Sequence, residues 1–94
     1  MSVIVRIPAP LRSKVGGRRQ IELTAHTFRA LLEEMEAAYP GITERLRDNE
    51  GRLRRTLNIY VNGENIRFLQ GLDTPLKDGD EVSFVPVIAG GGLL

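Results

Sequence analysis

Hydrophobic and polar residues follow two different periods along the chain, and the changes of period mark its elements. Val3–Ile7 is a short apolar run that Pro8 and Pro10 stop, which predicts a first strand. Gln20–Thr24 alternates apolar and polar residues, as in a half-buried strand. The Gly16-Gly17 pair predicts a turn between them, so the two segments are expected to form a hairpin with a long loop.

From Thr27 the apolar residues recur at helical spacing, with charged residues on the opposite face. The apolar positions are Phe28, Leu31, Leu32, Met35 and Tyr39. Pro40-Gly41 is typical of a helix end, so one amphipathic helix is expected. Residues 42–46 are expected to form one short helical turn, and residues 47–55 a polar loop.

The second half of the chain returns to a period of two. Leu57–Val61 predicts a strand, and the Asn62-Gly63 turn leads into a short strand at Ile66–Phe68. Asp78-Gly79-Asp80 is expected to turn the chain into a last strand, Glu81–Val87. This order predicts an α+β roll, in which one main helix covers one face of a mixed sheet of four to five strands.

The period of two also assigns side chains to the faces of the sheet. The residues expected beneath the helix are Leu57, Ile59, Val61, Val82 and Phe84. Tyr60 and Val85 are left on the open face, and Phe68 and Val87 are assigned to it with them. An exposed aromatic residue beside valines is a candidate partner-binding patch. The alternative is a set of scattered surface apolar residues, which are common.

Composition narrows the possible functions. The 94 residues fit one domain, expected at residues 1–88 and followed by a glycine tail at residues 89–94. The absence of cysteine excludes disulfides, thiolate metal sites and a thiol nucleophile. A net charge of +1 argues against nucleic acid or membrane as the main partner. No membrane span or signal peptide is evident, so a cytoplasmic protein is expected.

The glycine tail is the most informative chemical feature. Gly90, Gly91 and Gly92 follow almost directly on the last predicted strand. Glycine has no Cβ, so such a thread can enter a narrow catalytic slot that any side chain would block. We therefore expect the main-chain carboxylate to be the reactive group.

Several segments together resemble the β-grasp, or ubiquitin-like, sulfur carriers of the ThiS/MoaD type. They are Asn58–Glu64, Leu76–Val82 and Val87–Gly91. Further segments resemble in particular the carriers of cysteine biosynthesis: Ile7-Pro8, Leu11-Arg12, Gly41–Leu46 and the stretch from Val61-Asn62 to Arg67-Phe68. The resemblance covers nearly the whole chain.

The resemblance implies a carrier protein and not an enzyme. In this family an E1-like adenylyltransferase joins the terminal glycine carboxylate to AMP from ATP, and sulfur then replaces AMP to give a thiocarboxylate. No permanently bound cofactor is implied, because the activating enzyme uses the ATP. By resemblance, Ala89, Gly90 and Gly91 thread into that enzyme, and Gly91 carries the sulfur. The implied acceptor is a PLP-dependent enzyme of the cysteine-synthase type; the thiamine and molybdopterin pathways are the alternatives.

The end of the chain departs from the family pattern, which usually stops at the position of Gly91. Here Gly92, Leu93 and Leu94 follow. One interpretation is a precursor from which these three residues are removed, and the resemblance implies a JAMM-type zinc peptidase for that step. The other interpretations are an artificial extension, a carrier that has lost its function, or a working end at Gly92.

Two other function classes share the same features. A ubiquitin-like protein modifier would use the same activated glycine but transfer it to lysine amines. A plain interaction module would have an inert tail. Because the first chemical step is common to carrier and modifier, the sequence does not separate them.

The remaining polar signals favour ordinary structural roles. The arginine run could bind an acidic partner or phosphates, although a solvated loop is the preferred interpretation. It consists of Arg45, Arg47, Arg52, Arg54 and Arg55. His26 is the only histidine and is expected at the helix start or surface. Asp78, Asp80 and Glu81 lack the spacing of a calcium loop, so no metal site is expected.

Overall fold

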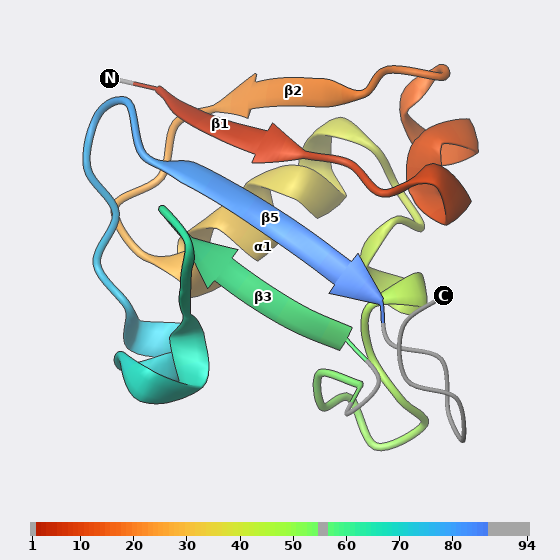
Figure 1. Ribbon diagram of the computed structural model, residues 1–94. Coiled ribbons are helices and arrows are strands. Elements are labelled where there is room, and N and C mark those ends of the chain that lie inside the picture. The colour runs from red at the N-terminus through yellow and green to blue at the C-terminus, as the bar shows by residue number, and fades with distance from the viewer. Residues whose placement is uncertain (1, 55–56, 87–94) are drawn as a thin grey trace.

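The computed structural model describes residues 2–54 and 57–86, which form a mixed five-stranded sheet and one α-helix (Figure 1). The strand order across the sheet is β2 (Gln20–Leu23), β1 (Val3–Arg6), β5 (Glu81–Pro86), β3 (Leu57–Val61) and β4 (Glu64–Asn65). β1 and β5 are parallel, and the other neighbours are antiparallel. The predicted α+β roll and its hairpin of β1 and β2 are confirmed.

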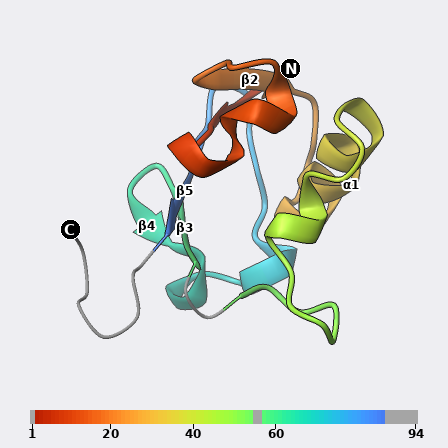
Figure 2. The same cartoon turned by 90° about the vertical axis from the view of Figure 1, so that its right-hand side faces the viewer.

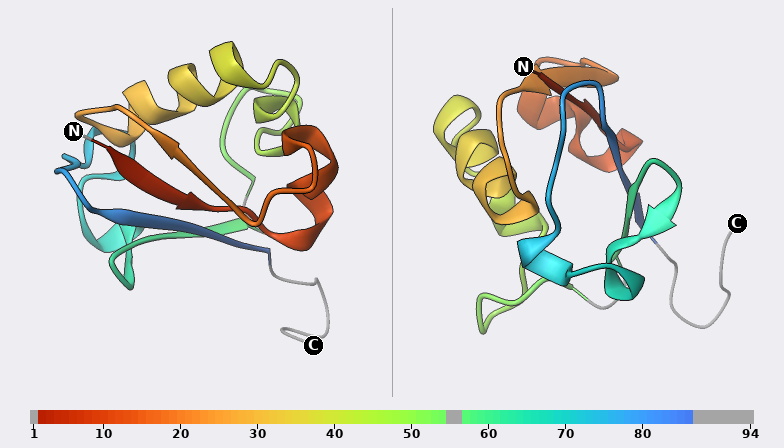
Figure 3. Two further views of the ribbon diagram at one scale, coloured as in Figure 1. Left: turned by 90° about the horizontal axis from the view of Figure 1, so that it is seen from above. Right: turned by 90° about the vertical axis from the view of Figure 1, so that its left-hand side faces the viewer.

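Helix α1 (Phe28–Ala38) covers one face of the sheet, as the edge-on views in Figures 2 and 3 show. It begins where the sequence predicts, because the Thr27 hydroxyl accepts a hydrogen bond from the Ala30 N–H at 3.1 Å. Beyond its end, Gly41 adopts a φ of 94°, a conformation that favours glycine. Among the described residues, no α-helix lies on the opposite face of the sheet, which is therefore called the open face.

The hydrophobic core fills the space between α1 and the sheet. The helix contributes Phe28, Leu31, Leu32 and Met35, and β3 and β5 contribute Leu57, Ile59, Val61, Val82 and Phe84. All of these are buried, so the predicted assignment of the inner face is confirmed. The rings of Phe28 and Phe84 lie 6.1 Å apart and join helix to sheet.

The long loop of the first hairpin contains a 3-10 helix that the sequence pattern did not predict, η1 (Ala9–Val15). Pro8 and Pro10 stop β1 as expected and also begin this helix, since proline is tolerated in a first helical turn. Leu11 and Val15 are buried, so η1 closes the core at the end of the sheet where β5 also ends.

One predicted strand is wrong. Residues 66–68 form a 3-10 helix, η3 (Ile66–Phe68), and β4 is limited to the two residues before it. The side chain of Asn65 accepts a hydrogen bond from the Arg67 N–H at 2.9 Å, which begins the helical turn. Two other 3-10 turns are η2 (Thr43–Arg45), within the predicted stretch 42–46, and η4 (Gly71–Asp73). No helix among the described residues is long and apolar enough to cross a membrane.

Candidate functional site

Tyr60 and Val85 both lie on the open face, on the adjacent strands β3 and β5. Tyr60 pairs with Ser83, and Val85 pairs with Asn58, so the two apolar side chains are diagonal neighbours. Both residues are half-buried. Their strand partners are polar, so the apolar area is a narrow strip and not a broad patch.

β1 extends the open face on the other side of β5. Ile4 pairs with Glu81, and Arg6 pairs with Ser83. The guanidinium group of Arg6 contacts the Glu81 carboxylate at 3.0 Å, an exposed ion pair of small energetic value. The half-buried Ile4 therefore lies beside a charged pair, which limits the apolar strip on this side.

Phe68 occupies a different place from the one expected. It belongs to the 3-10 helix η3, where side chains do not alternate between two faces as they do in a strand. Its side chain is 86% exposed. It lines a hollow with Leu69, Pro75 and Lys77 near the turn that follows β3. The structure thus places Phe68 at the β4 edge of the sheet, and not in line with Val85 at the end of β5.

One residue of the predicted patch and all tail residues of the predicted site lie outside the described residues. These are Val87, Ala89, Gly90 and Gly91, with the extension Gly92, Leu93 and Leu94 and the expected domain boundary at residue 88. The last described residue is Pro86, which pairs with Leu57 at the end of β5. The described part of the site therefore ends where the tail begins.

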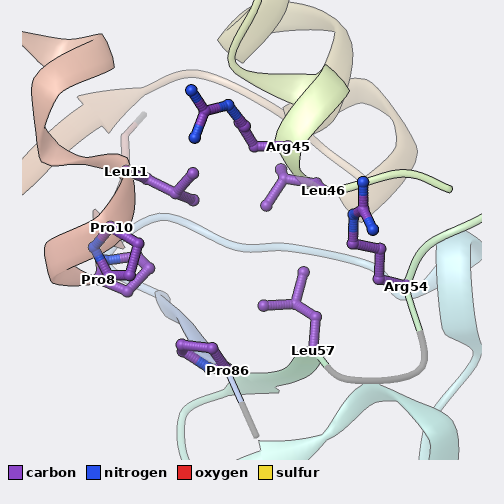
Figure 4. A pocket seen from close by; sticks show the side chains of 8 residues that line it. All are labelled: Pro8, Pro10, Leu11, Arg45, Leu46, Arg54, Leu57 and Pro86. Carbon is purple, nitrogen blue, oxygen red and sulfur yellow. The ribbon is translucent and has the colours of Figure 1, made fainter. Parts of the chain in front are cut away.

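A pocket of about 110 Å³ lies directly beside Pro86 (Figure 4). We call it the Pro86 pocket; it is lined by Pro8, Pro10, Leu11, Arg45, Leu46, Arg54, Leu57 and Pro86. Its described lining has no acidic side chain. Figure 4 shows the guanidinium groups of Arg45 and Arg54 on either side of Leu46.

The structure divides the arginine run into two groups. Arg47 donates to the Gly51 carbonyl at 2.7 Å, and Arg52 lies 3.9 Å from the Glu50 carboxylate. Both contacts join residues of the same loop, as expected for a loop that faces solvent. Arg45 and Arg54 line the Pro86 pocket instead, while Arg55 lies outside the described residues.

The same loop is organised by a carboxylate. Asp48 accepts hydrogen bonds from the backbone N–H groups of Arg52 and Glu50 at 3.0 and 2.9 Å. These bonds, with smaller contributions from the charges of Arg52 and Arg54, lower the pKa of Asp48.

The carboxylates near the start of β5 have structural partners. Asp78 accepts from the Ser2 N–H at 2.8 Å, and Asp80 accepts from the Lys77 N–H at 2.8 Å. His26 is exposed just before α1. Within residues 2–54 and 57–86, no three His, Cys, Asp or Glu residues are grouped so that they could hold a metal ion.

The Pro86 pocket is the feature that the sequence analysis missed. Its lining comes from η1, from the residues around η2, and from β3 and β5, which are far apart in the chain. A hydrophobic period shows that Leu11, Leu46 and Leu57 are buried, but it does not show that they meet. The arginine run was the one available signal.

Comparison with known proteins gives consistent matches over nearly the whole chain. The sequence pattern of the ThiS family matches residues 5–91. The sulfur carrier protein CysO of Mycobacterium tuberculosis is 45% identical over 93 residues, which cover 97% of this chain and 100% of that protein.

Solved structures agree with the sequence matches. The crystal structure of Mycobacterium tuberculosis CysO superposes with a TM-score of 0.86 at 43% identity, covering 92% of this chain and 99% of that one. A chain of the BexX/CysO complex of Amycolatopsis orientalis superposes with a TM-score of 0.85 at 39% identity, covering 95% and 99%. The predicted β-grasp fold is confirmed.

Proposed function

The chain belongs to the ThiS family, and from this premise we propose that it is a sulfur carrier protein whose terminal glycine becomes a thiocarboxylate. The observation that carries the proposal is the whole-length similarity to CysO, together with a run of three glycines that begins four residues after the end of β5. A protein of this kind is a substrate of other enzymes and is not itself an enzyme. We further propose that its sulfide serves biosynthesis, with cysteine as the product.

The chemistry explains why the tail has to be activated. A carboxylate resists nucleophiles because it is negatively charged and resonance-stabilised. In the proposed first step, a carboxylate oxygen of the terminal glycine attacks the α-phosphorus of ATP, and pyrophosphate leaves. A hydrosulfide equivalent then attacks the acyl carbon, AMP leaves with the bonding electrons, and the thiocarboxylate remains.

The length of the tail is compatible with delivery of its end into a buried site. The five residues from Val87 to Gly91 reach at most about 16 Å, at about 3.3 Å per residue. That length lets the globular body dock outside a slot while the glycine end reaches the reaction centre. In this proposal the enzyme contacts the Tyr60 and Val85 strip and supplies the electrostatic stabilisation of the transition state.

The proposed partners follow from the steps required. An E1-like adenylyltransferase activates Gly91, a PLP-dependent enzyme of the cysteine-synthase type accepts the sulfide, and a JAMM-type zinc peptidase removes Gly92, Leu93 and Leu94. No cofactor is bound permanently, because ATP belongs to the activating enzyme. The complex of CysO with BexX supports the general idea that a relative of this chain binds a partner protein.

Intact-mass analysis of the protein from its own host tests the proposal. We expect a species that ends at Gly91 and is heavier than the carboxylate form by the difference between one sulfur and one oxygen atom. Isopeptide conjugates without that species would instead identify a protein modifier. If a Gly91-ending form and the host's adenylating enzyme give no ATP–pyrophosphate exchange, the tail is inert and the proposal is wrong.

A further inference from the structure

We propose that the Pro86 pocket docks the adenylating enzyme, which inserts an apolar side chain flanked by a carboxylate. The inference rests on the proposed function, because it concerns the enzyme that takes the tail. The pocket would be a second contact surface, separate from the open face, at the point where the chain leaves β5.

The chemistry of the pocket defines its occupant. Six of the lining residues are apolar and two carry guanidinium groups, and no acidic side chain is present in the described lining. Among the described residues, neither Arg45 nor Arg54 has an acidic partner within ion-pair distance. The charge of Arg54 acts on the nearby Asp48, but that carboxylate accepts two backbone N–H groups and forms no ion pair with Arg54. A partner that offers one apolar side chain and one carboxylate would satisfy both parts of this surface.

The position of the pocket selects a peptide segment over a nucleotide. Pro86 forms part of the wall, and up to about 16 Å of chain separates it from the reacting carboxylate of Gly91. In the proposed complex the tail is fully extended into the slot, so Arg45 and Arg54 would lie at its mouth and not at the phosphates of ATP. The group that faces them there is the surface of the enzyme.

The pocket is also built before any partner arrives. Leu11, Leu46 and Leu57 belong to the buried core, and prolines form much of the remaining wall. Proline and packed core residues lose little conformational entropy on binding, so most of the contact energy is available for affinity. Pro86 follows Val85 in β5, so the pocket and the Tyr60 and Val85 strip lie on opposite faces of the sheet, and both border the point where the chain leaves β5.

The test measures ATP–pyrophosphate exchange by the host's adenylating enzyme with Gly91-ending carriers. In the Arg45→Glu/Arg54→Glu variant we expect KM to rise about tenfold with kcat unchanged, because the lost contact stabilises ground state and transition state equally. The control Arg19→Glu/Arg67→Glu has the same change of charge outside the pocket, and we expect the KM of the parent. Arg45→Lys/Arg54→Lys keeps the positive charge, and we expect a KM within about threefold of the parent.

The outcomes separate this inference from the proposed function. Absence of exchange with the parent carrier would contradict the proposed function itself. Exchange with an unchanged KM in Arg45→Glu/Arg54→Glu, or an equal rise in the control variant, would overturn the docking site alone. Circular dichroism and a thermal melt of each variant confirm that the compared carriers are folded.

Discussion

The Nδ2 atom of Asn62 donates a hydrogen bond to Oδ1 of Asp80 at 2.9 Å, which joins the turn after β3 to the turn before β5. The Oδ1 atom of Asn62 in turn accepts the Glu81 N–H at 3.0 Å. Asn62 also has a φ of 52°, in the left-handed region that asparagine tolerates better than most residues. One side chain therefore fixes both turns and the start of β5.

Asn62→Ala is expected to lower the free energy of unfolding by about 2 kcal/mol, since it loses two hydrogen bonds and strains the backbone. Asn62→Gly removes the same hydrogen bonds but accepts the positive φ, so we expect about half of that loss. Urea denaturation of both variants measures the difference. Equal stability of Asn62→Ala and the parent would show that these bonds contribute nothing.

This bond illustrates what the sequence predicts and what it does not. The Asn62-Gly63 and Asp78-Gly79-Asp80 turns follow from local residue preferences, and the buried faces of β3 and β5 follow from a period of two. The contact between the turns joins residues 18 positions apart and depends on the register of β5 against β3. Local patterns do not contain that register.

The features that were predicted wrongly or missed have similar physical causes. Ile66–Phe68 is a short apolar run, and such a run fits a strand or a helical turn equally well. The deciding interaction is the Asn65 side chain, which begins η3. At the site, the alternation of side chains along β3 and β5 correctly placed Tyr60 and Val85 on one face. The same alternation does not apply to Phe68, which lies in a 3-10 helix. The Pro86 pocket forms only when segments far apart in the sequence pack together, so no local pattern of residues predicts it.

The hydrogen bonds of the Glu36 carboxylate are expected to make the free energy of unfolding depend on pH. Its carboxylate accepts hydrogen bonds from the Thr43 hydroxyl at 2.6 Å and from the N–H groups of Gly41 and Thr43 at 2.8 and 3.2 Å. The bond from the Thr43 hydroxyl contributes most to lowering the pKa of Glu36, followed by the two backbone N–H groups. These bonds connect the end of α1 to η2.

Because the folded-state pKa is lowered, this carboxylate stabilises the fold above about pH 4.5, and the contribution is lost as the pH falls through the lower, folded-state pKa. Glu36→Gln should therefore melt at a lower temperature than the parent at pH 7, with a smaller difference at pH 3. Glu33→Gln, at an exposed position of the same helix, serves as the control. Equal differences at both pH values would contradict the assigned role of ionisation.

Tyr60→Asp tests the open face as a docking surface. We expect the Kd for the adenylating enzyme to rise at least about tenfold, because a charge replaces an aromatic contact. The loss of stability should be only about 1 kcal/mol, since Tyr60 is half-buried and outside the core cluster. Ala37→Asp on the exposed side of α1 is the matched control and should bind as the parent does. Calorimetric titration and a denaturation curve together separate lost binding from lost folding.

Gly91→Ala tests the steric argument for a glycine end. In a Gly91-ending carrier, we expect the added methyl group to reduce adenylation at least about tenfold, because a misplaced reacting group loses the alignment that the slot provides. Ala89 already carries a methyl group two residues earlier, so the narrow part of the slot has to begin after that position. Gly90→Ala should then show an intermediate defect, and Ala89→Gly should show none. ATP–pyrophosphate exchange with the three variants measures this gradient.

Equal rates for all three variants would contradict the steric argument. The enzyme would then recognise the tail without a glycine-only constriction, and the glycines would serve only to let the chain bend.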